Sequence, residues 1–80
     1  MKAQDALRKR ILELAEQKNL SMNKIASNCF INTSTIISLL NGHSKKSEIT
    51  TISKICYGLG VSMREFFDSP IFENIDDLEE

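Results

Sequence analysis

The side chains with the clearest chemical capacity lie between residues 32 and 41, a segment of amides, hydroxyls and apolar residues without charge. If Ile36 marks the centre of a buried helix face, a rotation of 100° per residue places Leu39 and Leu40 beside it. The opposite face then carries Ser34, Ile37, Ser38 and Asn41, with Thr33 and Thr35 at its amino-terminal end. Short amides and hydroxyls exchange hydrogen bonds with base edges and phosphates. This face is therefore predicted to contact another macromolecule, because a merely solvated helix face usually carries Lys and Glu.

Positive charge lies on both sides of this segment. Lys24 precedes it, and Lys45 and Lys46 follow it closely. Phosphates lie at such places beside a helix that is inserted in a DNA groove. The amino ends of the helices expected at 22–28 and 33–41 also attract anions through their N–H groups. The residues expected to contact phosphates are Asn23, Lys24, Asn32, His43 and Lys45.

The net charge of −1 conceals an uneven distribution. All ten basic residues fall before residue 68, where only five acids accompany them, so residues 1–67 carry +5. The other six acids lie in the last thirteen residues, which carry −6. The sequence thus predicts a moderately basic body, which suits a polyanionic partner, and an acidic tail.

Catalysis, cofactors and metals are not expected. His43 is the single histidine, and Cys29 and Cys56 lack the spacing of a zinc site, so we interpret both thiols as ordinary buried side chains. A helical domain of 80 residues also offers little pocket for a substrate or a small-molecule ligand. No apolar stretch approaches the ~20 residues that span a bilayer, and the first residues lack an apolar signal core. We expect a cytoplasmic protein without membrane contact.

Helical periodicity predicts the elements that must position these residues: about 4–18, 22–28, 33–41, 48–58 and 63–68. Three of the helix starts share one pattern, in which an N-cap residue is preceded by an apolar residue and followed four positions later by another. The N-cap residues are Ser21, Asn32 and Ser62, and the apolar pairs are Leu20 with Ile25, Ile31 with Ile36, and Val61 with Phe66. No segment alternates with a period of two. The predicted fold class is all-α, a compact bundle of about five short helices.

Only about four residues separate the helices expected at 22–28 and 33–41. So short a connection forces a sharp crossing, as in a helix-turn-helix. Residues 7–67 resemble the Cro/C1-type (Xre-like) helix-turn-helix family of bacterial and phage transcriptional regulators. The matching elements are Ser21, Ile25-Ala26, Ile31, Ser34-Thr35-Ile36, Asn41-Gly42 and the run TISKICYGLGVSMREFF.

The resemblance implies a lambda repressor-like DNA-binding domain with 33–41 as the recognition helix in the major groove. It also implies a symmetric dimer on a double-stranded DNA operator, which would then be palindromic, and a repressor-like role. The sequence departs from the family where Met22 and Thr33 replace common glutamines, and where Phe30 replaces the usual turn glycine. Ile37 stands at a position that is often polar, where it fits a thymine methyl or a protein surface. The alternative function is an antirepressor-like or antitoxin-like interaction module, with weak or no DNA binding.

Two units are predicted along the chain, a helix-turn-helix domain at 1–69 and an acidic tail at 70–80. Ile71, Ile75 and Leu78 are spaced for a short amphipathic helix, while a frayed terminus is the other interpretation. A core this small need not bury every apolar residue near the carboxyl end. The residues expected at a dimer interface are Phe67, Ile71 and Phe72.

Overall fold

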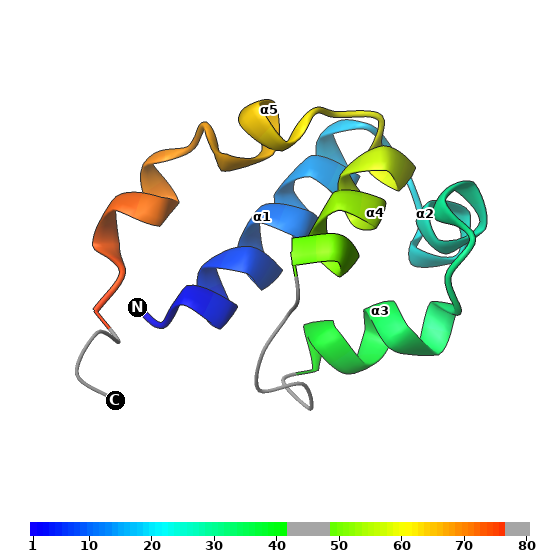
Figure 1. The fold of residues 1–80 in the computed structure, drawn as a ribbon, viewed down its shortest axis with the longest axis horizontal. Helices are drawn as coiled ribbons and strands as arrows, with labels where there is room; N and C mark the ends of the chain where they lie inside the picture. The colour runs from blue at the N-terminus through cyan, green and yellow to red at the C-terminus, as the bar shows by residue number, and fades with distance from the viewer. Residues whose placement is uncertain (42–48, 77–80) are drawn as a thin grey trace.

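Helices make up the computed structural model, which describes residues 1–41 and 49–76 (Figure 1). In chain order they are α1 (Ala3–Gln17), α2 (Met22–Cys29), α3 (Thr33–Leu40), α4 (Ile49–Leu59), α5 (Met63–Phe67) and the 3-10 helix η1 (Pro70–Asn74). Within the described ranges there is no strand. The predicted all-α class is confirmed, and the five α-helices lie close to their expected bounds.

Serine hydroxyls begin two of the helices as predicted. The Ser21 Oγ accepts a hydrogen bond from the Lys24 N–H at 3.1 Å, and the Ser62 Oγ accepts one from the Glu65 N–H at 3.0 Å. Asn32 has the extended backbone of an N-cap residue before α3, but its side chain makes no capping hydrogen bond. Its carbonyl oxygen instead accepts the Thr35 N–H at 3.0 Å. The expectation that the Asn32 side chain caps α3 was therefore wrong.

One connection recurs three times. Asn19, Phe30 and Gly60 have φ values of 55°, 60° and 77°, in the left-handed region. After each of them an apolar residue donates its N–H to a carbonyl oxygen five residues earlier: Leu20 to Ala15, Ile31 to Ala26 and Val61 to Cys56, at 2.9, 3.2 and 3.0 Å. This is the Schellman pattern of helix ends. The apolar residue expected to open each new helix therefore also closes the preceding one.

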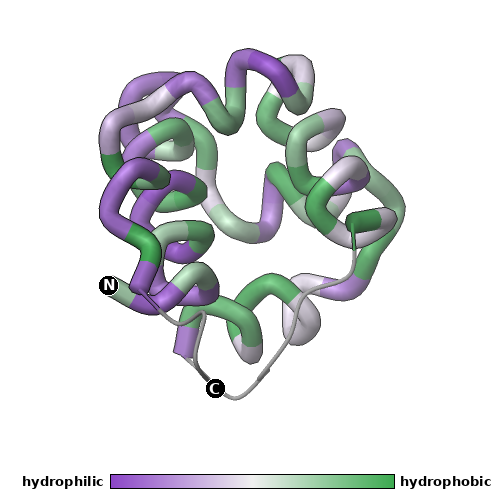
Figure 2. The backbone as a smooth tube through the Cα atoms, turned by 60° about the vertical axis from the view of Figure 1, so that its left-hand side comes forward, coloured by the Kyte–Doolittle hydropathy of each residue, from purple (hydrophilic) through white to green (hydrophobic). Residues whose placement is uncertain are grey.

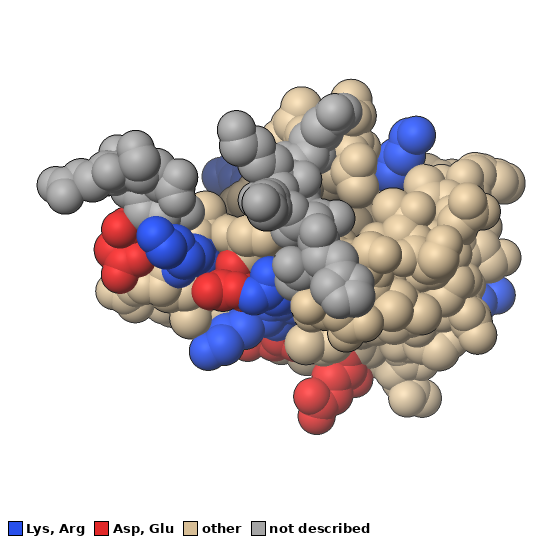
Figure 3. All heavy atoms as spheres, turned by 90° about the horizontal axis from the view of Figure 1, so that it is seen from below, with Lys and Arg blue, Asp and Glu red and all other residues tan. Residues whose placement is uncertain are grey.

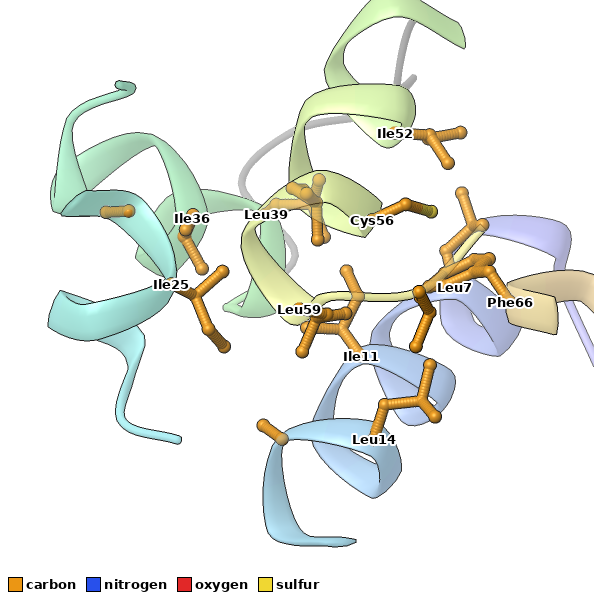
Figure 4. Packing of buried hydrophobic residues seen from close by; sticks show 14 residues of the cluster. Leu7, Ile11, Leu14, Ile25, Ile36, Leu39, Ile52, Cys56, Leu59 and Phe66 are labelled. Atoms are coloured by element: carbon orange, nitrogen blue, oxygen red, sulfur yellow. The ribbon is translucent and has the colours of Figure 1, made fainter. Parts of the chain in front are cut away.

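The core lies between the helices and draws on all five α-helices (Figure 4). Its fully buried large side chains are Ile11, Ile25, Ile36, Ile55, Leu59 and Phe66. Figure 2 shows hydrophobic and hydrophilic residues alternating along the helical coils, as amphipathic helices require. Both cysteines are buried and free, as predicted.

Helices α2 and α4 cross closely at Gly58. A Cβ atom on this residue would lie 2.5 Å from the Ile25 carbonyl oxygen and 3.2 Å from the Cys29 sulfur. The Asn28 Nδ2 donates a hydrogen bond to the Gly58 carbonyl oxygen at 3.2 Å, across the same contact. This crossing fixes the position of α2, and through its short connection that of α3.

The carboxyl-terminal segment lies against α1 (Figure 1). The Phe72 ring of η1 is partly buried, and its centroid lies 5.0 Å from that of Phe67 and 6.0 Å from that of Phe66. The amino group of Met1 pairs with the Asp76 carboxylate at 2.8 Å, and the Asp76 N–H donates to the Met1 carbonyl oxygen at 3.1 Å.

Residues 70–74 thus form a 3-10 turn, and Leu78 of the expected apolar stripe lies outside the described residues. None of the helices in the described ranges is long and apolar enough to cross a membrane.

Candidate nucleic-acid interface

Helix α3 presents the polar face that its periodicity predicts. Ile36 and Leu39 are buried, at 0% and 3% exposure, and Leu40 is partly buried against the core. On the other side, the exposed residues are Ser34, Thr35, Ile37 and Asn41, while Thr33 and Ser38 are partly exposed. The orientation follows from the core contacts, because burial of Ile36 and Leu39 turns the hydroxyls and the amide outward.

Among the described residues, the surface around α3 carries little charge. Figure 3, viewed from the side on which α3 lies, shows a broad area of other residues over the half of the molecule that holds this helix, with basic side chains at its margin. Acidic and basic side chains gather instead over the other half. An uncharged face presents hydrogen-bonding groups at little desolvation cost.

Three of the five residues expected to contact phosphates lie within the described ranges, and two lie outside them. Asn23 and Lys24 are exposed on the first turn of α2, and Asn32 is exposed directly before α3. The structure therefore brings Lys24 and Asn32 to the amino ends of consecutive helices. His43 and Lys45 lie outside the described residues.

Four positions at which the sequence departs from the resembling family have distinct surroundings. Met22 packs partly against the core, and Thr33 opens α3. Phe30 ends α2 in the left-handed conformation with its side chain 91% exposed. A bulky side chain in that region is strained, as expected where a glycine usually stands. Ile37 is 44% exposed, in the middle of the polar face.

One residue that holds the scaffold escaped the sequence analysis. Arg10 is 8% exposed, and its Nε donates to the Phe66 carbonyl oxygen at 2.6 Å while a terminal nitrogen donates to the Glu65 carbonyl oxygen at 2.8 Å. The guanidinium also pairs with Glu13. Its position three residues after Leu7, on the apolar side of α1, was the available signal.

No group of three or more potential metal ligands occurs among the described residues. Burial raises the pKa of both thiols, that of Cys56 to about 11, so neither is a ready nucleophile.

Solved structures with a similar fold include a prophage protein and a restriction-modification controller protein. The prophage Lp1 protein 11 is 37% identical, with a TM-score of 0.78, and the match covers 94% of this chain and all of that one. A point mutant of the restriction-modification controller protein C.Esp1396I is 20% identical, with a TM-score of 0.79 over 91% of this chain and 94% of that one. The wild-type controller is 18% identical, with a TM-score of 0.76 and 88% of each chain covered. No family model and no curated protein sequence matches the chain.

Proposed function

The chain belongs to the family of the prophage Lp1 protein 11, and from this premise we propose that it is a small regulator that binds double-stranded DNA. The observation that carries the proposal is the exposed, uncharged face of α3, held outward by the burial of Ile36 and Leu39. The controller proteins named above have the same fold and a regulatory name, which supports this class of function.

In the proposed complex, α3 lies in the major groove. Ser34, Ser38 and Asn41 face the base edges, where hydroxyls and an amide donate and accept hydrogen bonds. Ile37 contributes an apolar surface that suits the methyl group of thymine. Thr33 and Thr35 lie at the end of α3 that enters the groove first, which is the usual geometry of a helix-turn-helix.

Phosphate contacts position the protein but do not read the sequence. We assign them to Asn23 and Lys24 on α2, to Asn32, and to His43 and Lys45 after α3. The amino ends of α2 and α3 add partial positive charge.

We propose further that the protein binds as a symmetric dimer and acts as a repressor. One recognition helix reads only a few base pairs, so specific binding needs a second half-site about one helical turn away. Phe67, 38% exposed, and the partly exposed Ile71 are the proposed contacts. Phe72 contributes through the tilted contact of its ring with that of Phe67. Sedimentation of the Ile71→Asp variant with and without DNA checks this contact, and an unchanged assembly state would place the interface elsewhere.

The central proposal is tested without knowledge of the operator. Fluorescence anisotropy with a random duplex at two salt concentrations measures the non-specific affinity and its salt dependence. The expected result is binding that weakens steeply with salt. The logarithm of the binding constant should fall with the logarithm of the salt concentration, with a slope of about −0.9 for each phosphate neutralised. Absence of binding at low salt would overturn the proposal and favour the protein-interaction alternative, for which the exposed Ile37 is the supporting feature.

A further inference from the structure

A cleft separate from the polar face of α3 runs along α1. Its volume is about 410 Å³, within the roughly 300–1,000 Å³ range of ligand sites. The residues that line it are Met1, Asp5, Arg8, Lys9, Leu12 and Leu40. The four lining residues from Asp5 to Leu12 follow each other at helical spacing, so they form one stripe along α1 beside the last residue of α3, and Met1 lies just before the helix. From Asp5 to Leu12 the stripe extends roughly 10 Å along the helix axis.

Charge and apolar surface are ordered along this stripe. Leu12 is 49% exposed at one end, next to the partly buried Leu40, and Met1 is partly exposed at the other end. Arg8 and Lys9 lie between these apolar ends. Arg8 is paired with Asp5, whereas Lys9 is exposed and has no ion pair among the described residues. Asp5, Arg8 and Lys9 together give the centre of the cleft a charge of +1, with Lys9 as the unpaired cation, between two apolar ends.

We propose that this cleft binds a short acidic segment of a partner protein, with carboxylates facing Lys9 and Arg8 and large apolar side chains at the two ends. The complementarity of charge selects carboxylates, and the apolar ends select a peptide over a DNA backbone, because Leu12 and Leu40 offer phosphates no hydrogen bond. A groove of this length suits a chain segment better than a compact small molecule.

Binding at this cleft reaches the proposed DNA-binding element. Leu40 is the last residue of α3, and Asn41 on the polar face follows it directly. An occupant of the cleft would therefore contact the end of α3 without covering Ser34 or Ile37. This consequence rests on the proposed function, but binding of the segment itself does not.

The test is an NMR titration of the isotope-labelled full chain, without DNA, with the peptide Gly-Leu-Glu-Glu-Leu-Gly. The expected result is a saturable shift of the Lys9, Leu12 and Leu40 amides. We expect about fivefold weaker binding by Lys9→Glu and about threefold weaker binding by Leu12→Ser. Lys54→Glu, which makes the same charge change at an exposed site on α4, should remain within about twofold of the parent. Thermal unfolding of each variant separates weaker binding from loss of the fold.

Two further peptides and a separate titration with duplex DNA distinguish the proposal from its alternatives. Gly-Leu-Lys-Lys-Leu-Gly and Gly-Ser-Glu-Glu-Ser-Gly should bind more weakly than the parent peptide, because each lacks one of the two complementary features. The proposal would be overturned if either peptide bound as tightly as Gly-Leu-Glu-Glu-Leu-Gly, if Lys9→Glu bound that peptide as tightly as the parent protein does, or if the cleft amides did not shift. If duplex DNA shifts the Lys9 and Leu12 amides and the acidic peptide does not, the cleft is a nucleic-acid contact and the proposal is wrong.

Discussion

At the scale of single residues, Arg10 connects the first and last α-helices. Helix α5 has only five residues, so the carbonyl groups of its last turn lack intrahelical partners. The buried guanidinium supplies hydrogen bonds to the carbonyl oxygens of Glu65 and Phe66. Loss of this group removes the buried hydrogen bond to the Phe66 carbonyl oxygen, which is costlier than loss of an exposed pair, while the Glu65 carbonyl oxygen keeps the Asp68 N–H at 3.3 Å.

Replacement Arg10→Met is expected to lower the free energy of unfolding by about 2–3 kcal/mol, because charge-assisted hydrogen bonds to the buried Phe66 carbonyl and the partly buried Glu65 carbonyl are lost. Arg8→Met is the matched control, since Arg8 lies on the same helix and pairs with the half-exposed Asp5. The control should change stability by about 0.5 kcal/mol or less. Urea unfolding measures both variants, and equal losses would refute the capping role of Arg10.

Gly58 sets the distance between α2 and α4. In Gly58→Ala the new methyl group meets the Ile25 carbonyl oxygen, and overpacking of this kind costs about 1–3 kcal/mol. Alanine favours the helix over glycine by roughly 1 kcal/mol, so the net expected loss is up to about 2 kcal/mol. Thermal unfolding should show a lower midpoint temperature for Gly58→Ala than for the parent. The midpoint of Ser53→Ala, at an exposed position on the same helix, should not be lowered. A stability above the parent's would mean that the new methyl group costs less than the roughly 1 kcal/mol that alanine adds to the helix, so that Gly58 does not set the distance between α2 and α4.

At the scale of elements, the same connection joins α1 to α2, α2 to α3 and α4 to α5. A left-handed residue, an apolar residue and an N-cap residue follow each other in all three. Glycine suits the first place best, and asparagine tolerates it, but Phe30 holds it before α3. The turn of the helix-turn-helix is therefore the strained member of the set.

Replacement Phe30→Gly relieves that strain and loses little buried surface, because the ring is 91% exposed. The free energy of unfolding should rise by roughly 0.5–1 kcal/mol, the left-handed penalty being partly offset by the greater freedom of glycine in the unfolded chain. Asn19→Gly, at the equivalent place after α1, should gain less. Chemical denaturation gives both values, and a destabilised Phe30→Gly would show that the exposed ring makes a stabilising contact.

The sequence was sufficient for the elements because their signals are local. Helical periodicity and the apolar residue before each N-cap predicted the five α-helices, and the burial of Ile36 was enough to orient the polar face of α3. Arg10 was missed because its partners are carbonyl groups 55 and 56 residues away, which no periodic pattern encodes. The cleft was missed for the same reason, since it exists only where Leu40 of α3 meets α1. The side chain of Asn32 was predicted wrongly because a cap-forming residue type does not guarantee the cap.

At the scale of the whole molecule, the two ends of the described chain are joined. The amino group of Met1 donates to the Asn74 carbonyl oxygen and pairs with the Asp76 carboxylate. The hydrogen bond from the Met1 amino group to the Asp76 carboxylate and the positive charge of that amino group lower the pKa of Asp76 below its usual value. A carboxyl whose pKa is lowered by folding stabilises the fold at pH values above its unfolded pKa of about 3.9. This stabilisation is lost as the pH falls through the lowered pKa of the folded state.

Asp76→Asn should therefore be less stable than the parent near neutral pH, and the difference should vanish in strong acid. Glu73→Gln removes one exposed negative charge from the same segment and serves as the control. Unfolding measured at several pH values gives the comparison. A difference that persists unchanged into strong acid would show that the ion pair is not its source.

If α3 enters the DNA groove as proposed, Ser34→Glu should weaken DNA binding directly. Ser34 is exposed on the first turn of α3, where a carboxylate stabilises the helix by roughly 0.3–1 kcal/mol but is repelled by phosphates. Anisotropy with duplex DNA at low salt should show an affinity at least about tenfold below the parent's, while thermal stability stays equal or rises. Ser53→Glu, with the same charge change on the exposed side of α4, should bind nearly as well as the parent. If Ser34→Glu binds duplex as tightly as Ser53→Glu does, α3 does not lie in the groove.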